Sequence, residues 1–289
     1  MRRELVTRAL RDRESMDVPR IAFVSGKGGV GKSTLALASA LTFGQSGMRT
    51  LVVDMNWRWG ALHILANAYP QASVAETMLG AAAIEDSVCH IAPRVDLLAS
   101  AAISAGGGWP PSEAITRFVD ALARMHGRYD VIIMDTPAGI IEQVDALALS
   151  ADTAVFVMTP DITAIADCYG MLKHLRSQRR EFLPGIVVNR TTTAQEAEDV
   201  MEKFDTLTGR FLGVRAPRLG FVTEDAQLRG GAVRKVSSDT AEMSRVTGQI
   251  AAVASLALRS ALKNRTVSEL STIIIRPMNF AMETPDSRE

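Results

Sequence analysis

A decapeptide rich in glycine and lysine, SGKGGVGKST at residues 25–34, constrains the fold of this chain more than any other stretch. It lies between the apolar run Ile21–Val24, which has the length of a strand, and Leu35–Phe43, which has the composition of a helix. The residues that match the spacing G-x-x-x-x-G-K-[ST] are Gly26, Gly31, Lys32 and Ser33. In such a unit, glycines let successive backbone N–H groups turn toward one anion, and the helix points its positive N-terminus at it. The segment therefore predicts a phosphate-binding loop, because a glycine-rich turn without a ligand does not need the full match.

Each residue of this loop has an expected task. Lys32 would contact the β- and γ-phosphates of a nucleotide, and the Ser33 hydroxyl would bind Mg²⁺. Lys27 is a second lysine, which a plain loop of this kind does not need. The residues expected to line the nucleotide are Gly26, Lys27, Gly28, Gly29, Val30, Gly31, Lys32, Ser33 and Thr34.

Short apolar runs alternate with helical stretches from residue 20 onward. The runs are nearly continuous and rich in β-branched residues, as expected for parallel strands that are covered on both faces. They are Ile21–Val24, Leu51–Val53, Val95–Ala99, Val131–Met134, Ala154–Met158, Ile186–Val188 and Leu219–Val222. Helices are expected at Leu35–Phe43, Pro111–His126, Ala164–Arg179 (capped by Thr163) and Ala194–Leu207, and an apolar stripe indicates another over 240–263. The alternation predicts a doubly wound α/β fold with a mostly parallel sheet of seven or eight strands, helices on both faces, and the ligand at the carboxyl ends of the strands.

The composition limits the remaining classes. The chain has 289 residues with 32 basic and 32 acidic side chains, so its zero net charge gives no global reason to bind nucleic acid. No apolar run approaches the ~20 residues of a membrane span, and the charged N-terminus is unlike a signal peptide. Cys89 and Cys168 show neither a disulfide pattern nor metal-ligand spacing. These features favour a cytoplasmic protein with an arm at 1–19, a P-loop domain at 20–263 and a tail at 264–289.

Two aspartates follow predicted strands and are candidates for binding Mg²⁺. Asp54 ends the second strand, and Asp135 ends the Walker-B-like run Val131–Met134, where it would hold Mg²⁺ through water. For Asp135 taken alone, a buried strand with a capping aspartate is the alternative. Gly139 lies in the next loop, and its N–H could reach the γ-phosphate, which would make residues 135–141 a nucleotide-sensing switch.

Several segments resemble the MinD/ParA family of P-loop ATPases, most closely its flagellar FlhG branch. They are the loop GKGGVGKST, DTPAGI at 135–140, TPDITAIADCY at 159–169, RFLGV at 210–214 and LGFV at 219–222, and the resemblance spans roughly residues 20–236. It implies ATP and Mg²⁺ as cofactors and a homodimer with two ATP molecules at its interface. Lys27 would then act in trans on the ATP of the partner, and Asn189 would contact the adenine. A solvated lysine and a strand-end turn are the respective alternatives.

The chain departs from the family at the residues expected to control hydrolysis. The family usually has a D-x-D pair whose second aspartate positions the attacking water, and this chain reads Asp54-Met55-Asn56. An amide can orient water but cannot accept a proton, and general-base help is worth about 10²–10⁴-fold where it operates. Asp54 and Asn56, together with Lys27 and Lys32, are therefore the catalytic candidates, and slow hydrolysis is expected.

Other departures concern partners and the nucleotide base. Trp57 and Trp59 are unusual for a nucleotide-sensing loop, and both a partner-binding surface and packing on neighbouring helices are open for them. Val222-Thr223 replaces the usual Ile-Pro, which changes the backbone expected to wall the adenine. Of the N-terminal motif by which FlhG-type proteins engage the GTPase FlhF, only Leu10-Arg11 matches.

The resemblance implies an ATP-dependent dimerising switch that regulates the number or placement of flagella. A division-site or cargo-positioning ATPase and a scaffold that binds ATP but hardly hydrolyses it are the alternatives. A tyrosine kinase of the same superfamily is disfavoured, because no tyrosine cluster marks the C-terminus. The implied partners are a second copy of the chain, an FlhF-like GTPase and, weakly, the inner face of the cell membrane through Leu256–Arg265. Nucleic acid is not an expected partner.

Overall fold

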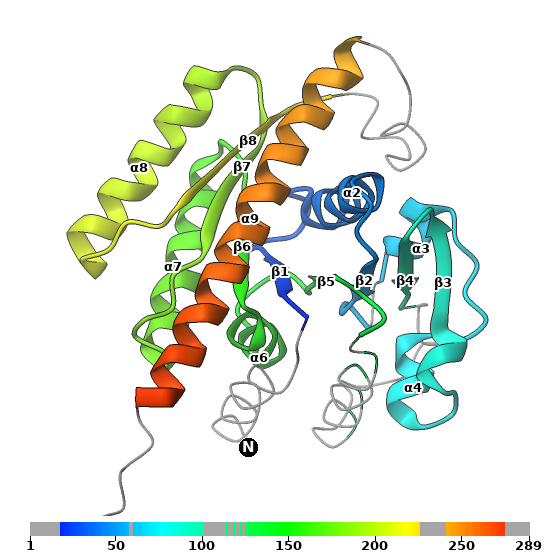
Figure 1. Cartoon of the computed structure of the whole chain (residues 1–289). Helices are drawn as coiled ribbons and strands as arrows, with labels where there is room; N and C mark the ends of the chain where they lie inside the picture. The colour runs from blue at the N-terminus through cyan, green and yellow to red at the C-terminus, as the bar shows by residue number, and fades with distance from the viewer. Residues whose placement is uncertain are drawn as a thin grey trace, which may run out of the picture.

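The computed structural model describes residues 18–57, 60–100, 127–225 and 241–274, with residues 114, 118, 122 and 125 between them (Figure 1). At 241–244 and 266–274 it describes the backbone only. The described strands form one eight-stranded sheet in the order β3-β4-β2-β5-β1-β6-β7-β8. Their bounds are β1 Arg20–Val24, β2 Thr50–Asp54, β3 Val88–Ala92, β4 Val95–Leu98, β5 Val131–Asp135, β6 Thr153–Met158, β7 Gly185–Thr191 and β8 Arg218–Thr223.

The predicted fold class is confirmed. Each of the seven predicted runs forms a strand, and neighbouring strands are parallel except for β3 and β4, which are antiparallel. Strand β3 was not predicted. It pairs with β4 alone and its residues are half-buried or exposed, so its sequence VCHIA needs no continuous apolar run.

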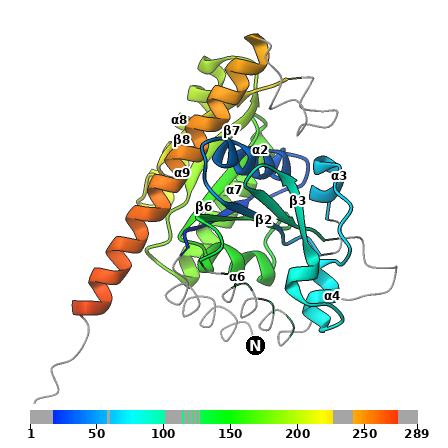
Figure 2. The same cartoon turned by 45° about the vertical axis from the view of Figure 1, so that its right-hand side comes forward.

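Helices cover both faces of the sheet (Figures 1 and 2). Side chains of α2, α3 and α9 enter the core on one face, and those of α4, α6, α7 and α8 enter the core on the other. The bounds are α2 Lys32–Gln45, α3 Leu62–Ala66, α4 Val74–Leu79, a 3₁₀ turn at Ile84–Ser87, α6 Glu142–Ser150, α7 Ile162–Gln178, α8 Ala194–Leu212 and α9 Ala241–Ile274.

The predicted helices are largely present, with two corrections. Helices α3 and α6 were not predicted, and α7 is capped by Asp161, whose carboxylate accepts the Ala164 N–H at 2.9 Å, and not by Thr163. The predicted helix at 111–126 lies outside the described residues apart from Ala114, Phe118, Leu122 and Met125, which are all buried.

The strand order places the glycine-rich loop at the point where the connections reverse direction. Strand β1 lies between β5 and β6, the chain leaves it for β2 on the β5 side, and the later strands β6, β7 and β8 lie on the other side. In doubly wound sheets, ligands bind at the carboxyl ends of the strands at such a reversal. The loop that follows β1 is therefore central in the sheet.

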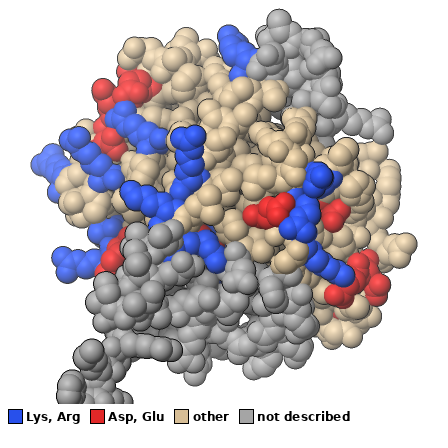
Figure 3. Space-filling model, viewed as in Figure 1, with Lys and Arg blue, Asp and Glu red and all other residues tan. Residues whose placement is uncertain are grey.

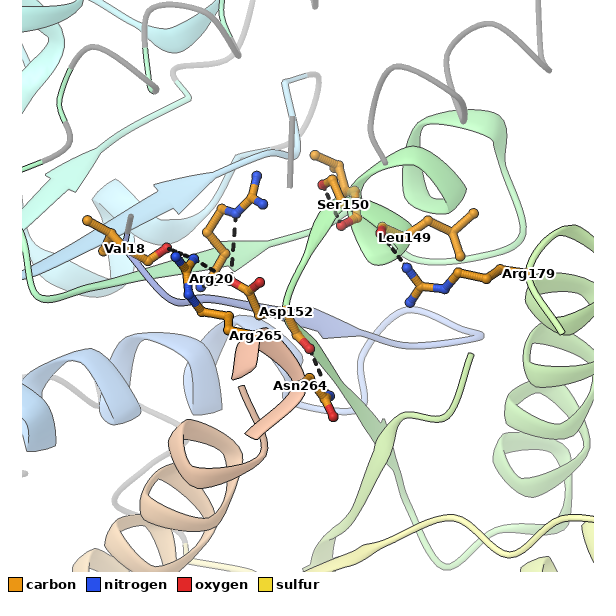
Figure 4. A network of polar contacts seen from close by, with 9 residues as sticks. Val18, Arg20, Leu149, Ser150, Asp152, Arg179, Asn264 and Arg265 are labelled. Atoms are coloured by element: carbon orange, nitrogen blue, oxygen red, sulfur yellow. Dashed lines mark hydrogen bonds and ion pairs between the residues drawn. The ribbon is translucent and has the colours of Figure 1, made fainter. Parts of the chain in front are cut away.

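Helix α9 is fixed to the body by its apolar stripe and by polar contacts near residue 264. The stripe is buried against the sheet as predicted, through Val246, Ile250, Val253, Ala254, Ala257 and Ala261. The helix continues past residue 263, where the Asn264 amide donates to the backbone oxygen of Asp152 at 2.9 Å. Arg265 lies 3.6 Å from the Asp152 carboxylate and donates to the Val18 carbonyl at 3.3 Å (Figure 4).

These contacts bear on the segment proposed to meet a membrane. Arg265 is engaged with Asp152, which is itself buried and also accepts the Arg20 backbone N–H at 2.8 Å (Figure 4). Leu256 and Leu262 remain 39% and 49% exposed. In the view of Figure 3, Lys and Arg gather on the side where α8 and α9 lie. Among the described helices, none combines the length and apolar character needed to span a bilayer.

Candidate nucleotide-binding site

The glycines of the loop are required by backbone conformation and by close packing. Gly29 and Gly31 have φ angles of 80° and 87°, in the left-handed region that favours glycine. A Cβ on Gly31 would lie 2.2 Å from Asn189 Nδ2, and a Cβ on Gly26 would lie 2.5 Å from the Cβ of Asp167 in α7. Both positions therefore exclude a side chain. Gly28 and Gly29 are exposed, with nothing within 4 Å of an added Cβ.

The loop lysine and the Walker-B-like aspartate lie in contact, an ion pair that was not predicted from the sequence. Lys32, the first residue of α2, lies with its Nζ 2.5 Å from Oδ1 of Asp135, the last residue of β5. Both side chains are almost fully buried. Ser33 follows on the first turn of α2 and is half-buried. A hydroxyl at a helix start beside a strand-end carboxylate is an oxygen-donor set of the kind that Mg²⁺ prefers.

The protein alone does not provide a complete metal cage. Within the described residues, no group of three or more His, Cys, Asp or Glu side chains could hold a metal ion. Mg²⁺ usually keeps waters and shares its coordination with substrate phosphates, so one hydroxyl and one carboxylate are a fitting protein contribution. The residues present therefore fit Mg²⁺ that arrives with a nucleotide.

Asp54 is buried and holds the loop that follows β2. Its Oδ1 accepts the Asn56 N–H at 3.0 Å, and its Oδ2 accepts the Leu62 N–H at 3.1 Å. Gly60 packs so closely that an added Cβ would lie 2.7 Å from Oδ2. The carboxyl therefore anchors Asn56 and Leu62, a role that the assignment of Asp54 to metal binding and catalysis did not foresee.

Burial also changes the acidity of Asp54. Desolvation, followed by the charge of Asp135 on the adjacent strand, raises the pKa of Asp54 to about 8, although the Leu62 and Asn56 N–H groups and Lys32 oppose the change. Asp54 and Asp135 lie side by side, as register partners in the parallel strands β2 and β5. At neutral pH the Asp54 carboxyl is thus mostly protonated.

The residues after Asp54 divide between the surface and the core. Asn56 is half-buried, and its N–H is one of the two that donate to the Asp54 carboxylate. Trp57 is fully buried in the core that α4, α6, α7 and α8 share, so the partner-surface hypothesis is wrong for this residue. Trp59 lies outside the described residues. Met55 and Trp57 are buried, and Asn56 between them is half-buried. This alternation indicates that the tryptophan side chain packs into the core.

The predicted switch segment contacts the P-loop directly. Gly139 has a φ of 96°, and its N–H donates to the Ser25 carbonyl at 2.9 Å. Thr136 Oγ1 donates to the Phe23 carbonyl at 2.8 Å. The Gly139 N–H, expected at the γ-phosphate, is thus donated to the P-loop backbone in this structure.

Lys27 lies at the rim of the loop and contacts the N-terminus of α7. Its Nζ lies 2.5 Å from Asp161 Oδ1 and donates to Thr163 Oγ1 at 2.9 Å. Its side chain is 34% exposed, against 8% for Lys32. Desolvation alone would raise the pKa of Asp161, but hydrogen bonds from Lys27 and three further donors together hold it well below its usual range.

A cavity of about 500 Å³ adjoins the loop on the side of β7 and β8. Its lining residues are Gly31, Thr34, Leu35, Leu65, Asn189, Arg190, Thr223, Glu224 and Asp225. Asn189, at the end of β7, is buried and donates its Nδ2 to the Val30 carbonyl at 2.8 Å. Its amide thus ties the P-loop to the cavity wall. Leu65 and Arg190 were not predicted, since Leu65 carries no motif and Arg190 joins the wall through a left-handed φ of 61°.

The fold and the loop define the class, a P-loop nucleotide-binding α/β protein. The AAA domain family matches residues 18–184 of the chain. The antiactivator FleN of Pseudomonas aeruginosa is 26% identical over 212 residues, which cover 72% of this chain and 75% of FleN. The flagellum site-determining protein YlxH of Helicobacter pylori is 26% identical over 214 residues, covering 72% of this chain and 71% of YlxH.

Solved structures share the fold. The septum site-determining protein MinD of Pyrococcus horikoshii, complexed with Mg-ADP, aligns with a TM-score of 0.64 at 21% identity, covering 90% of this chain and 100% of that one. The chain belongs to the AAA domain family, and its predicted resemblance to the FlhG branch of the MinD/ParA family is confirmed by its similarity to FleN and YlxH.

Proposed function

We propose that this protein is an ATP-dependent dimerising switch that regulates the number or placement of flagella. The observation that carries the proposal is the opposite disposition of the two loop lysines. Lys32 is buried on Asp135, whereas Lys27 is 34% exposed at the rim. Asp161 and Thr163, to which Lys27 donates, are themselves exposed. One lysine therefore serves the chain's own phosphate site, and the other can serve a second chain.

The residues of the site have the following roles in this proposal. Lys32 would bind the β- and γ-phosphate oxygens, and Ser33 and Asp135 would hold Mg²⁺, which would supply positive charge to the phosphates. Gly139 and its loop, bonded to Ser25, sense the change in the P-loop. Lys27 leaves Asp161 and Thr163 for the nucleotide of the partner chain. Asn189 positions the loop beside the base.

The test is the oligomeric state measured by size-exclusion chromatography with light scattering. We expect dimers in Mg-ATP and monomers in Mg-ADP. Lys27→Ala should still bind ATP but stay monomeric, whereas Lys32→Ala should lose ATP binding. Lys203→Ala, at an exposed lysine of α8, is the matched control and should dimerise normally. Monomers of the unmodified chain in both nucleotides would contradict the proposal.

We further propose that hydrolysis is slow because Asn56 stands where the family has an aspartate. The Asn56 amide can orient a water but cannot accept its proton. Asn56→Asp should therefore raise steady-state ATP turnover, by at most the ~10²–10⁴-fold that a general base supplies. Unchanged turnover in Asn56→Asp, with unchanged ATP affinity, would refute this explanation.

The flagellar role draws on similarity to two relatives, the antiactivator FleN and the flagellum site-determining protein YlxH. An FlhF-like GTPase is the partner that this role implies, although Leu10-Arg11, its only matching contact motif, lies outside the described residues. Deletion of the gene should change the number or position of flagella counted by electron microscopy. Normal flagella together with displaced division sites would favour the MinD-type alternative instead.

A further inference from the structure

The last residue of β8, Thr223, pairs in register with Thr191 of β7 and is also bonded to α9. Thr223 donates its backbone N–H to Gln249 Oε1 at 3.0 Å, and its hydroxyl to the same oxygen at 3.1 Å. Thr223 lines the 500 Å³ cavity beside the P-loop, whereas Gln249 lies behind the wall on α9. A single acceptor on α9 therefore holds both donors of this wall residue.

The hydrogen bonds between β7 and β8 near this wall do not use the Thr223 N–H, which donates to Gln249. The pairing of β7 and β8 shifts register between Asn189 and Thr191, where Arg190 bulges out with a φ of 61°. Beyond the shift, the Glu224 N–H donates to the Thr191 carbonyl at 2.8 Å. Thr223 thus pairs with Thr191 through the Glu224 N–H, while its own N–H donates to Gln249.

Helix α9 is a rigid support for this contact. Val246 and Val253 lie three residues before and four residues after Gln249, so all three share one face of the helix. Both valines are buried, and a Cβ on Gly220 of β8 would lie 3.6 Å from Val253 Cγ2. Figures 1 and 2 both show α9 lying along β8. The packing of Val246 and Val253 therefore holds the helix in place before and after Gln249.

We propose that Gln249 is a positioning residue for the base end of the nucleotide, acting through Thr223. The inference rests on the proposed function, in which the cavity takes the base of ATP. A proline at 223 would carry no N–H and no hydroxyl, so it would need no such acceptor. The two hydrogen bonds from Thr223 to Gln249, here called the clamp, thus set the position of the cavity wall. Loss of the clamp should weaken binding of the base and leave binding of the triphosphate unchanged.

The experiment compares Mg-ATP, Mg-GTP and Mg-tripolyphosphate binding by isothermal titration calorimetry. Gln249→Leu should weaken ATP binding roughly two- to tenfold, the range of one neutral hydrogen bond, reduce the preference for ATP over GTP, and leave tripolyphosphate binding unchanged. Gln249→Glu retains an acceptor and should keep ATP affinity. Gln195→Leu, at an exposed glutamine of α8, is the matched control.

A second background tests the route through Thr223. In Thr223→Pro, Gln249→Leu should cause no further loss of ATP affinity, because the donors that it serves are gone. If Gln249→Leu does not fold by circular dichroism, Thr223→Val removes the hydroxyl half of the clamp and gives the same comparison. Equal weakening of ATP and tripolyphosphate, or unchanged ATP binding in Gln249→Leu, would overturn the inference. Absence of ATP binding by the unmodified chain would contradict the proposed function and this inference with it.

Discussion

Asp54 should make the stability of the protein fall as pH rises, and Asp54→Asn should remove this effect. The carboxyl is buried beside Asp135, and its pKa is raised to about 8 in the folded state, whereas the ordinary pKa of an exposed aspartate is 3.8. The folded protein therefore keeps a proton on Asp54 across a range in which the unfolded chain has released it. Stabilisation from this group is complete below the unfolded pKa and is lost as pH rises through the folded pKa.

The size of this pH effect follows from the one extra proton that Asp54 binds in the folded state. Between about pH 5 and pH 7 the folded state binds about one proton more than the unfolded state at this site, so the free energy of unfolding falls by about 1.4 kcal/mol per pH unit. Over that interval the free energy of unfolding falls by about 2–3 kcal/mol because of Asp54. This is a large fraction of the 5–15 kcal/mol that is typical of folded domains.

The assay is urea denaturation at about pH 5, 6 and 7 in EDTA, because a bound cation would favour the ionised carboxylate. Asp54→Asn keeps an oxygen that accepts one of the two N–H groups but cannot titrate. Other titrating groups contribute equally to both proteins and cancel in the difference of slopes. Parallel pH dependences for the unmodified chain and Asp54→Asn would refute the reasoning.

Two further predictions concern the core and the membrane. Trp57→Ala should destabilise by about 3–5 kcal/mol and lower the thermal midpoint by roughly 10 °C, because the ring is fully buried, whereas Tyr69→Ala, at an 84% exposed ring, should leave the midpoint nearly unchanged in a thermal melt. A weak, ATP-dependent association with anionic vesicles should depend on the exposed Leu256 and Leu262. The double variant Leu256→Glu with Leu262→Glu should therefore no longer float with the vesicles. Flotation of the double variant, or no flotation of the unmodified chain, would exclude this segment as a membrane contact.

The sequence determined those features that depend on local chemistry. A loop that exposes successive N–H groups needs glycines at fixed positions, so Gly26 to Ser33 could be recognised without coordinates. Strands buried on both faces need continuous apolar runs, which is why seven of the eight could be predicted. Strand β3 and helix α6 could not, because a half-buried edge strand and a short helix leave no distinctive period.

The tertiary structure decided the features that depend on which distant residues meet. Only the packing shows that Trp57 faces the core, that Asp54 lies beside Asp135 in a neighbouring strand, and that Gly139 donates to Ser25. Gln249 illustrates the limit, since it stands in an ordinary helical stripe and gains its contact with Thr223 only because α9 packs along β8. Periodicity along the chain predicts which face of an element is buried, but the partner on that face is set by the arrangement of elements in space.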